Sequence, residues 1–301
     1  MTQPDADPSP GLSYLIPAYN EEHSIGTTIE RLKSILSTLD MPWEIVIIND
    51  GSRDGTLAAA QAHDGVRVVS HPTNIGYGSA LKAGICAARH QWIGIVDADD
   101  TYDIEQIPTL VEQMRAGFDM VVAARSNVLD LDRPVKRQFR RLLIAFLNLV
   151  IGARIEDPNS GFRIFTRDLA MTFFPFLCNT FSFTTSLTVF ALGERYFVKY
   201  VPLPYFKRSG KSKVRHFRDS LRMMQLVLQG ITFFNPIKFY LMMVVGLLVG
   251  FLVPSAILLS QGAGPLAALW FGFGAVSALM IGLGVLGDII RISAIGRDKR
   301  G

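Results

Sequence analysis

The chain has 301 residues, of which 49% are hydrophobic and 19% are charged, and its formal net charge is +4. The apolar residues gather near the C-terminus, because segment 236–290 carries no charged side chain except Lys238 and Asp288. The rest of the chain has the charge content of an ordinary globular domain. This composition excludes a disordered chain, a collagen-like chain and a disulfide scaffold. It predicts a water-soluble body followed by a membrane piece with two spans.

Residues 1–11 are polar and rich in proline, so we expect a disordered lead-in rather than a signal peptide. The body is then expected to stay on the side of the membrane where it was made. Cys86 and Cys178 are far apart in the sequence and show no spacing typical of zinc ligands. We expect both to be small buried side chains.

Short β-rich runs alternate with helical patterns between residues 12 and 213. Strands are predicted over 12–16, 44–49, 66–70, 92–97 and 120–124, and helices over 24–39, from 55, over 79–88 and over 104–116. This order predicts an α/β domain over 12–213, with a mostly parallel sheet and helices on both of its faces. In such sheets ligands bind beyond the carboxyl ends of the strands.

Polar segments follow the first, second and fourth predicted strands. They read Pro-Ala-Tyr-Asn-Glu at 17–21, Asn-Asp-Gly-Ser-Arg-Asp-Gly-Thr at 49–56 and Asp-Ala-Asp at 97–99. Each alone is compatible with an ordinary turn or helix cap, but together they predict a site. Asp97 and Asp99 can converge on one Mg²⁺ or Mn²⁺, which would bridge and stabilise a departing diphosphate. Asp50 would accept hydrogen bonds from a base or ribose, with a turn-forming role as the alternative.

Gly76, Gly78 and Gly84 follow the third predicted strand. A dinucleotide-binding fingerprint would instead follow the first strand, with an acidic residue closing the second. The position of the glycines therefore argues against a Rossmann dehydrogenase. We expect them to open a helix and to let the backbone pass close to the donor.

Two apolar runs, 236–259 and 265–290, are each long enough to cross about 30 Å of hydrocarbon. The link between them is short and uncharged, whereas Lys and Arg flank both outer ends. The positive-inside rule then predicts an integral inner or cell membrane protein with two spans, whose body and both termini are cytoplasmic. Residues 291–301 would form a basic cytoplasmic tail. A helical hairpin buried in a soluble core is the alternative.

Two further helices are expected near the membrane. Residues 214–235 place apolar side chains at helical spacing opposite charged ones, which predicts an amphipathic interfacial helix on the cytoplasmic leaflet. Residues 135–152 begin with a basic cluster and continue with an apolar run that is too short to span a membrane. We expect an interfacial or a core helix there. The basic cluster consists of Lys136, Arg137, Arg140 and Arg141.

Four cations interleaved with Ser and Gly precede the amphipathic segment. They are Lys207, Arg208, Lys211 and Lys213. At the height of the lipid headgroups such a cluster predicts a phosphate trap. A general contact with anionic lipid is the alternative, and the two roles are compatible.

Six motifs, in this order, resemble family 2 glycosyltransferases. They lie at 17–21, 50–56, 74–78, 97–99, 124–125 and 157–163, the last reading Asp-Pro-Asn-Ser-Gly-Phe-Arg. The chain is similar to the polyprenyl-phosphate branch, which includes dolichol-phosphate mannosyltransferase, and its two spans fit bacterial members that use undecaprenyl phosphate. The resemblance covers about residues 12–235. It implies a GT-A fold, a UDP- or GDP-sugar donor, a divalent metal (Mg²⁺ or Mn²⁺), inversion at the anomeric carbon and a polyprenyl-phosphate acceptor.

The resemblance also implies roles for individual residues. The donor side would comprise Pro17, Tyr19, Glu21, Asp50, Gly76 and Asp97, with Asp97 and Asp99 as metal ligands. Asp99, Arg125 and Asp157 would be catalytic, with Arg125 meeting phosphate charge and Asp157 orienting the acceptor or accepting a residual proton. The acceptor phosphate would contact Arg163, Lys207, Arg208, Lys211 and Lys213. We also expect contact with membrane lipid and a homo-oligomer, and no nucleic-acid partner.

The chain departs from the family pattern at two places. Related mannosyltransferases often have Gln where this chain has Thr101, so that position is not expected to supply a third metal ligand. The basic loop reads Lys-Arg-Ser-Gly-Lys-Ser-Lys, whereas the family commonly has Arg-x-x-Gly-x-Ser-Lys, so either Lys207 or Arg208 fills the Arg position.

Two other functions are the alternatives to this reaction. A processive polysaccharide synthase would resemble a chain with Gln-x-x-Arg-Trp and more spans, and no tryptophan here has that context. A catalytically silent adaptor of a lipid-sugar translocation assembly would not require the carboxylate pair together with the arginines.

Overall fold

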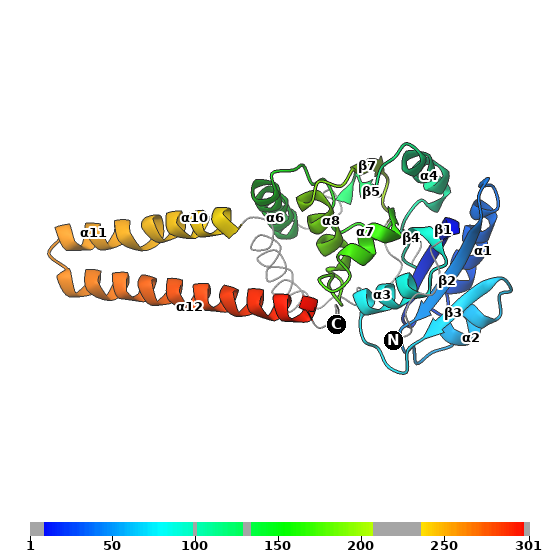
Figure 1. Ribbon diagram of the computed structural model, residues 1–301, viewed down its shortest axis with the longest axis horizontal. Helices are drawn as coiled ribbons and strands as arrows, with labels where there is room; N and C mark the ends of the chain where they lie inside the picture. The colour runs from blue at the N-terminus through cyan, green and yellow to red at the C-terminus, as the bar shows by residue number, and fades with distance from the viewer. Residues whose placement is uncertain (1–8, 99–100, 129–133, 207–235, 298–301) are drawn as a thin grey trace. The chain divides into compact units, whose positions relative to one another are not determined.

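The structure is a computed structural model that describes residues 9–98, 101–128, 134–206 and 236–297. It divides into two compact units, residues 1–224 and residues 225–301, and each is described by itself. The first unit contains the sheet and the motif-bearing loops (Figure 1). The second contains the long C-terminal helices.

A seven-stranded sheet forms the centre of the first unit, in the order β3-β2-β1-β4-β6-β5-β7 (Figure 1). Neighbouring strands run parallel except β6, which is antiparallel to both β4 and β5. The predicted mostly parallel sheet is therefore confirmed. The strands are β1 Ser9–Ala18, β2 Trp43–Asn49, β3 Val66–Ser70, β4 His90–Ile95, β5 Met120–Arg125, β6 Arg163–Thr166 and β7 Val198–Leu203.

Helices follow most of the strands, as the sequence pattern predicts. In the first unit they are α1 Ile25–Leu36, α2 Thr56–Gln61, α3 Tyr77–Ala87, the short 3-10 helix η1 Ile104–Gln106, α4 Ile107–Arg115, α6 Pro134–Ile151, α7 Arg167–Thr172 and α8 Phe183–Gly193. Five strands, β1 to β5, and five helices, α1 to α4 and α6, lie within a few residues of their predicted positions. The strands β6 and β7 and the helices α7 and α8 were not predicted individually.

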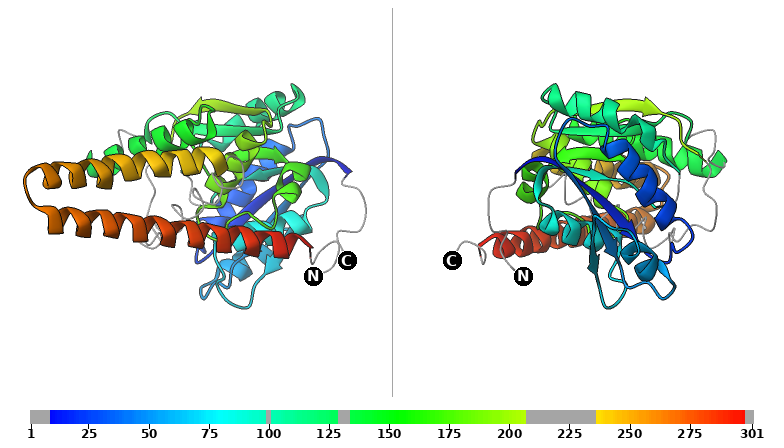
Figure 2. Two further views of the ribbon diagram at one scale, coloured as in Figure 1. Left: turned by 60° about the vertical axis from the view of Figure 1, so that its left-hand side comes forward. Right: turned by 90° about the vertical axis from the view of Figure 1, so that its right-hand side faces the viewer.

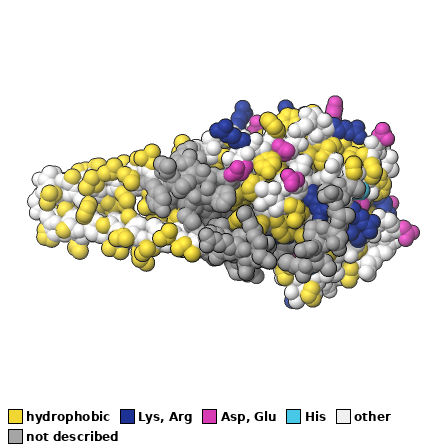
Figure 3. Space-filling view, viewed as in Figure 1, with side chains coloured by type: hydrophobic (Ala, Val, Ile, Leu, Met, Phe, Trp, Pro, Cys, Tyr) yellow, Lys and Arg dark blue, Asp and Glu magenta, His cyan; other side chains and the backbone are white. Residues whose placement is uncertain are grey.

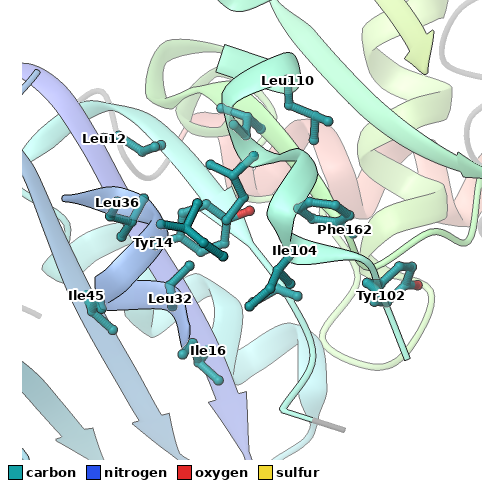
Figure 4. Packing of buried hydrophobic residues seen from close by; sticks show 14 of the residues in the cluster. Leu12, Tyr14, Ile16, Leu32, Leu36, Ile45, Tyr102, Ile104, Leu110 and Phe162 are labelled. Carbon is teal, nitrogen blue, oxygen red and sulfur yellow. The ribbon is translucent and has the colours of Figure 1, made fainter. Parts of the chain in front are cut away.

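Both faces of the sheet are covered. Successive side chains of β1 point to opposite faces, and those on each face are buried against helices. Tyr14 belongs to the cluster of buried side chains that also contains the apolar face of α1 and residues of α4 (Figure 4). Leu15 points to the other face, where Gly84 of α3 lies close to it. Gly94 of β4 leaves room for the Tyr14 ring, because a Cβ at Gly94 would lie 2.5 Å from a ring carbon. Helices on both faces are also visible in Figure 2.

Helix α6 is partly a core helix. It packs against α8, and its Leu147 is fully buried. Leu142 and Leu149, in contrast, are 63% and 62% exposed. Within the first unit, one side of α6 therefore belongs to the core and another presents apolar side chains outward.

The second unit is a hairpin of long apolar helices. It consists of α10 Pro236–Leu247, the π-helical segment η2 Leu248–Leu252, α11 Val253–Ser260 and α12 Gly264–Arg297. Two stretches, Met243–Ser260 and Gly264–Gly287, are long and apolar enough to cross a membrane. Apolar side chains dominate the visible surface of the hairpin (Figure 3). The predicted pair of long apolar helices is confirmed.

A contact between the hairpin's two arms accompanies the π-helical segment. Pro254 has no N–H to donate to the carbonyl of Gly250, four residues earlier. Trp270 of α12 donates its indole N–H to that carbonyl at 3.1 Å. The Phe251 ring lies next to the Trp270 ring, and a Cβ at Gly274 would overlap the Phe251 side chain. The proline thus leaves a carbonyl that the opposite helix satisfies, as an apolar surrounding requires.

The structure differs from the sequence prediction at several places. Strand β1 begins at Ser9, inside the expected lead-in, and α12 continues to Arg297, inside the expected tail. The prediction that both cysteines are buried is wrong, because Cys86 is exposed on α3 and Cys178 is only half-buried. The predicted amphipathic helix 214–235 lies outside the described residues.

Candidate functional site

The loops after β1 and β2 are joined by crossed hydrogen bonds. The Asn20 backbone N–H donates to Ser52 Oγ at 3.0 Å, and the Arg53 N–H donates to Asn20 Oδ1 at 2.9 Å. One residue on, the Glu21 N–H donates to Thr56 Oγ1 at 2.8 Å. Asn20 has a φ of +51°, a conformation that Asn tolerates better than most residues. The structure therefore brings the first two motifs together at the carboxyl ends of their strands.

Three predicted donor residues lie on or next to this edge. Pro17 is in the last part of β1, paired with Ile48 of β2, and Tyr19 and Glu21 follow the strand. All three side chains are half-buried. Their contacts with a nucleoside stay a prediction.

Asp50 is buried and organises the loop after β3. Its Oδ1 lies 2.9 Å from His71 Nδ1 and accepts the backbone N–H of Ile75 at 3.0 Å. Its Oδ2 accepts the N–H of Gly76 at 2.9 Å. The carboxylate therefore fixes the turn that leads into α3. These contacts agree with the turn-forming role that was predicted as the alternative. A base or ribose that binds Asp50 would have to share its carboxylate oxygens with these partners.

The glycines of the third motif approach another part of the same chain. Gly76, with a φ of +109°, precedes α3, so the prediction that the glycines open a helix is confirmed. A Cβ at Gly76 would lie 2.8 Å from the carbonyl oxygen of Asn179, and one at Gly78 would overlap the carbonyl oxygen of Cys178. The Ser79 N–H donates to Asn179 O at 3.1 Å. The small residues thus admit the 178–180 segment, a contact that the sequence did not predict.

Asp97 follows the end of β4 and is held from two sides. The Tyr77 hydroxyl donates to Asp97 Oδ1 at 2.9 Å, and a Cβ at Gly161 would lie 2.6 Å from Asp97 Oδ2. The carboxylate is half-buried and offers hard oxygen ligands of the kind that Mg²⁺ and Mn²⁺ bind. Asp99 lies outside the described residues. Among the residues that are described, no three His, Cys, Asp or Glu side chains form a cluster that could hold a metal.

Arg125 and Asp157 form a two-point ion pair. Arg125 Nε lies 2.6 Å from Asp157 Oδ2, and Nη2 lies 2.7 Å from Oδ1. Burial raises the pKa of Asp157, but the hydrogen bonds and charge of Arg125 lower it more, so that the pKa lies below its usual range. Asp157 is therefore ionised at neutral pH and a weak proton acceptor.

Arg163 is fully buried, and its guanidinium is used within the protein. It donates to the carbonyl oxygens of Pro158, Ser160 and Thr184 and to Thr188 Oγ1. These contacts tie the 157–161 loop to α8. Burial lowers the pKa of Arg163. The structure does not bring its N–H groups to the surface, where an acceptor phosphate would meet them.

A cavity of about 610 Å³ opens beside the Arg125–Asp157 pair. It is lined by both members of the pair and by Arg140, Arg141 and Arg154. Apolar side chains of α6 and of the 154–157 loop complete its wall. Among its lining residues arginines outnumber carboxylates, so the cavity is suited to an anion that carries an apolar group.

The last described residues before the basic 207–213 segment contact residues that follow the Asp-Ala-Asp motif at 97–99. Tyr205 and Tyr102 form an isolated β-bridge, and the Phe206 N–H donates to Thr101 O at 2.9 Å. Tyr205 also lies under the Arg125 guanidinium, 5.2 Å from ring centroid to Cζ. Residues 207–213, with the four predicted phosphate-binding cations, lie outside the described residues. The segment just before them is thus joined to residues next to Asp99 and to Arg125.

The fold and the order of these motifs match a known family. The model of glycosyl transferase family 2 matches residues 13–174, which is more than half of the chain. The chain belongs to glycosyl transferase family 2. The resemblance inferred from the six motifs is therefore confirmed.

Two curated relatives show what this family 2 glycosyltransferase is similar to. A low-salt glycan biosynthesis hexosyltransferase of Haloferax volcanii is 32% identical over 74% of this chain and 54% of its own length. An undecaprenyl-phosphate 4-deoxy-4-formamido-L-arabinose transferase of Pectobacterium atrosepticum is 32% identical over 57% of this chain and 56% of its own length. The chain thus spans about half the length of these curated relatives.

A solved structure supports the fold. Glucosyl-3-phosphoglycerate synthase from Mycobacterium tuberculosis, crystallised with Mn²⁺, UDP and glucosyl-3-phosphoglycerate, superposes with a TM-score of 0.55. The two are 24% identical, and the match covers 74% of this chain and 79% of that one. At this identity the likeness shows the shared fold.

Sequence reasoning missed several residues of this glycosyltransferase site. Arg154 and Tyr205 lie outside the motifs and reach the site only through the tertiary fold. Tyr77 lies inside the glycine motif, but nothing in its spacing indicates that its hydroxyl meets Asp97. Arg140 and Arg141 were visible as a basic cluster at the start of a helix, a signal that did not specify a cavity.

Proposed function

We propose that the chain transfers a sugar, with inversion, from a nucleotide-sugar donor to a polyprenyl phosphate at the membrane surface. The observation that carries this proposal is the arginine-lined cavity, because it shares the 157–161 loop with Asp97. One side of that loop can thus serve the donor diphosphate and the other an acceptor phosphate. The two long apolar helices and the names of the relatives, which include undecaprenyl-phosphate and dolichyl-phosphate sugar transferases, support the same reaction.

The donor would lie along the joined loops after β1 and β2, with its diphosphate toward Asp97. Pro17, Tyr19 and Glu21 would line the nucleoside pocket, while Asp50 and Gly76 shape its floor through the turn before α3. Asp97 and Asp99 would hold Mg²⁺ or Mn²⁺. When bound, the metal neutralises charge on the leaving diphosphate. The hard oxygens of the Asp-x-Asp pair fit such an ion, and the fold is shared with a synthase crystallised with Mn²⁺.

The acceptor phosphate would enter the arginine-lined cavity. A phosphate monoester has a second pKa of about 6 and is mostly dianionic at pH 7, so its oxygen is already a nucleophile. The chain then has to align that oxygen with the anomeric carbon and to neutralise charge. Arg140, Arg141 and Arg154 supply charge at the cavity. The four cations of the basic loop are proposed to add to this positive charge, since the preceding Phe206 is hydrogen-bonded to Thr101. They are Lys207, Arg208, Lys211 and Lys213.

Two motif residues are assigned positioning roles. Asp157 is paired with Arg125 and has a lowered pKa, so we assign it the orientation of Arg125 rather than proton transfer. Arg163 binds three carbonyl groups and would keep the 157–161 loop in shape between donor and acceptor. Arg125 itself, stacked on Tyr205 at the cavity wall, would contact phosphate charge.

The site would operate at the cytoplasmic face of the membrane. The apolar helices of the second unit would be its two spans, with both outer ends and the catalytic unit in the cytoplasm. The cations that flank the spans support this orientation.

Incubation of the purified chain with a panel of nucleotide sugars and undecaprenyl phosphate, followed by mass analysis of the lipids, tests the proposed reaction. We expect one donor to give a lipid-linked sugar. Arg140→Ala should lower kcat/KM for the lipid phosphate about ten- to a hundredfold, because a charge-assisted contact is lost. Arg115→Ala, at the end of α4 and outside the cavity, is the matched control. No lipid product with any donor would contradict the proposal.

A further inference from the structure

Tyr77 makes a contact that the proposed reaction does not use directly. It is the first residue of α3, and its hydroxyl donates to Asp97 Oδ1 at 2.9 Å. The bond joins the glycine motif to the metal motif, 20 residues apart in the sequence. A hydroxyl that donates to one carboxylate oxygen restricts rotation of the carboxylate, because turning it would break the bond.

The Asp97 carboxylate is restricted from its other side as well. The Cα of Gly161 lies so close that a Cβ there would be 2.6 Å from Oδ2 and 3.1 Å from the carboxylate carbon. The Gly161 N–H in turn donates to Tyr102 Oη at 2.8 Å, so the backbone at that residue is held in place. The carboxylate therefore lies between a fixed backbone and the Tyr77 hydroxyl.

Tyr77 is itself held firmly. Its ring stacks on Phe181, with centroids 5.6 Å apart and planes inclined by 17°. Helix α3 is also tied to Asn179, which lies two residues before Phe181. The Ser79 N–H donates to the Asn179 carbonyl oxygen, and Lys82 Nζ donates to Asn179 Oδ1 at 2.8 Å. The hydroxyl that reaches Asp97 thus comes from a ring and a helix that the 178–181 segment keeps in position.

We infer that Tyr77 is a positioning residue that sets the orientation of the Asp97 carboxylate for binding a divalent cation. The inference rests on the metal site of the proposed function and adds a residue to it. Partners that orient metal ligands contribute to affinity, and their loss typically costs about ten- to a hundredfold in metal binding.

A Mn²⁺ titration of the full-length protein in detergent, without donor or acceptor, tests the inference. Electron paramagnetic resonance measures the free Mn²⁺ at each step. Tyr77→Phe keeps the ring and its stacking on Phe181 while removing the hydroxyl. Tyr14→Phe is the matched control, because the Tyr14 hydroxyl is buried and has no hydrogen-bond partner among the residues that the structure describes. The melting temperature of each variant without metal is recorded beside its dissociation constant for Mn²⁺.

We expect Tyr77→Phe to raise the dissociation constant for Mn²⁺ about ten- to a hundredfold and Tyr14→Phe to leave it unchanged. A purely structural role predicts a lower melting temperature for Tyr77→Phe with Mn²⁺ affinity equal to wild type, and that result would overturn the inference. It would leave the proposed sugar transfer standing, because that reaction is read from lipid products. A rise in the dissociation constant without lipid product would contradict the proposed function alone.

Discussion

Arg125 and Asp157 meet through two nearly equal contacts of 2.6 and 2.7 Å, although 32 residues separate them in the sequence. Their side chains are only 10% and 6% exposed. Arg125 ends β5, and Asp157 begins the loop that carries Gly161 to Asp97. The pair therefore anchors the 157–161 loop, which lines the arginine-lined cavity at Asp157 and approaches Asp97 at Gly161.

Replacing Asp157 with Asn should destabilise the protein strongly, because it leaves the Arg125 charge buried without its partner. Breaking such a pair costs about 3–5 kcal/mol, or roughly 6–20 °C in melting temperature for a domain of this size. Thermal unfolding in detergent measures the effect. Glu156→Gln is the control, since its exposed contact with Arg154 is 3.5 Å long and is worth less than about 1 kcal/mol. Equal effects of the two changes would show that the pair contributes little.

A second carboxylate, Glu44, lies at the opposite end of the strands and should influence stability only. It accepts the Ser13 hydroxyl, the Arg89 N–H and Arg67 Nη2, each at 2.6 Å. Burial raises the pKa of Glu44, but these bonds and the Arg67 charge lower it more, to below its ordinary value of 4.5. A lowered folded-state pKa contributes stability that is present above pH 4.5 and is lost as the pH falls through the folded value.

The difference in melting temperature between wild type and Glu44→Gln should therefore be largest near pH 6 and shrink below pH 4.5. Thermal unfolding at a series of pH values checks this. Sugar transfer at neutral pH should be unchanged in the folded variant, because Glu44 is remote from the loops that follow the strands. A difference that stays constant down to pH 3 would contradict the assignment.

In the apolar hairpin, the indole of Trp270 substitutes for the N–H that Pro254 lacks. Trp270→Phe should destabilise the hairpin by about 1 kcal/mol, the usual worth of such a bond between membrane helices. Pro254→Ala restores an N–H that can reach the Gly250 carbonyl, so the cost of Trp270→Phe should fall in that background. Thermal unfolding of the four proteins of this cycle measures the coupling, and strictly additive effects would refute it.

The orientation of the hairpin can be tested at Ser260, which is exposed at the end of α11. In a background without Cys86 and Cys178, a cysteine at position 260 should react with an impermeant maleimide only from the periplasmic side. A chain that keeps only the exposed Cys86 should react only from the cytoplasmic side. Labelling of both from the same side would overturn the proposed topology.

The sequence was informative where local pattern decides structure. Alternating strands and helices, and the polar residues that follow strands, predicted most of the sheet and the edge where the motifs meet. Strand β6, only four residues long, has no distinguishing pattern, and its antiparallel direction depends on its neighbours β4 and β5. Burial of a charged residue is equally invisible, so Arg163 was expected at a phosphate although the fold encloses it.

Contacts between segments that are distant in the sequence could not be predicted from it either. The motif containing Asp157 and the arginine at position 125 were both identified, but their pairing is a tertiary contact. The glycines at 76 and 78 were expected to approach a ligand, whereas the structure packs them on the 178–180 backbone. Small residues indicate a close approach without indicating what approaches.

The decisive measurement is the rate at which wild type and Asp99→Asn form lipid-linked sugar. Each protein is assayed with Mg²⁺ or Mn²⁺ and again with excess EDTA. We expect transfer to require divalent metal and to fall at least about a hundredfold in Asp99→Asn. A carboxylate next to a developing diphosphate contributes several kcal/mol through the metal that it holds. Full activity in EDTA, or wild-type turnover by Asp99→Asn, would contradict this expectation.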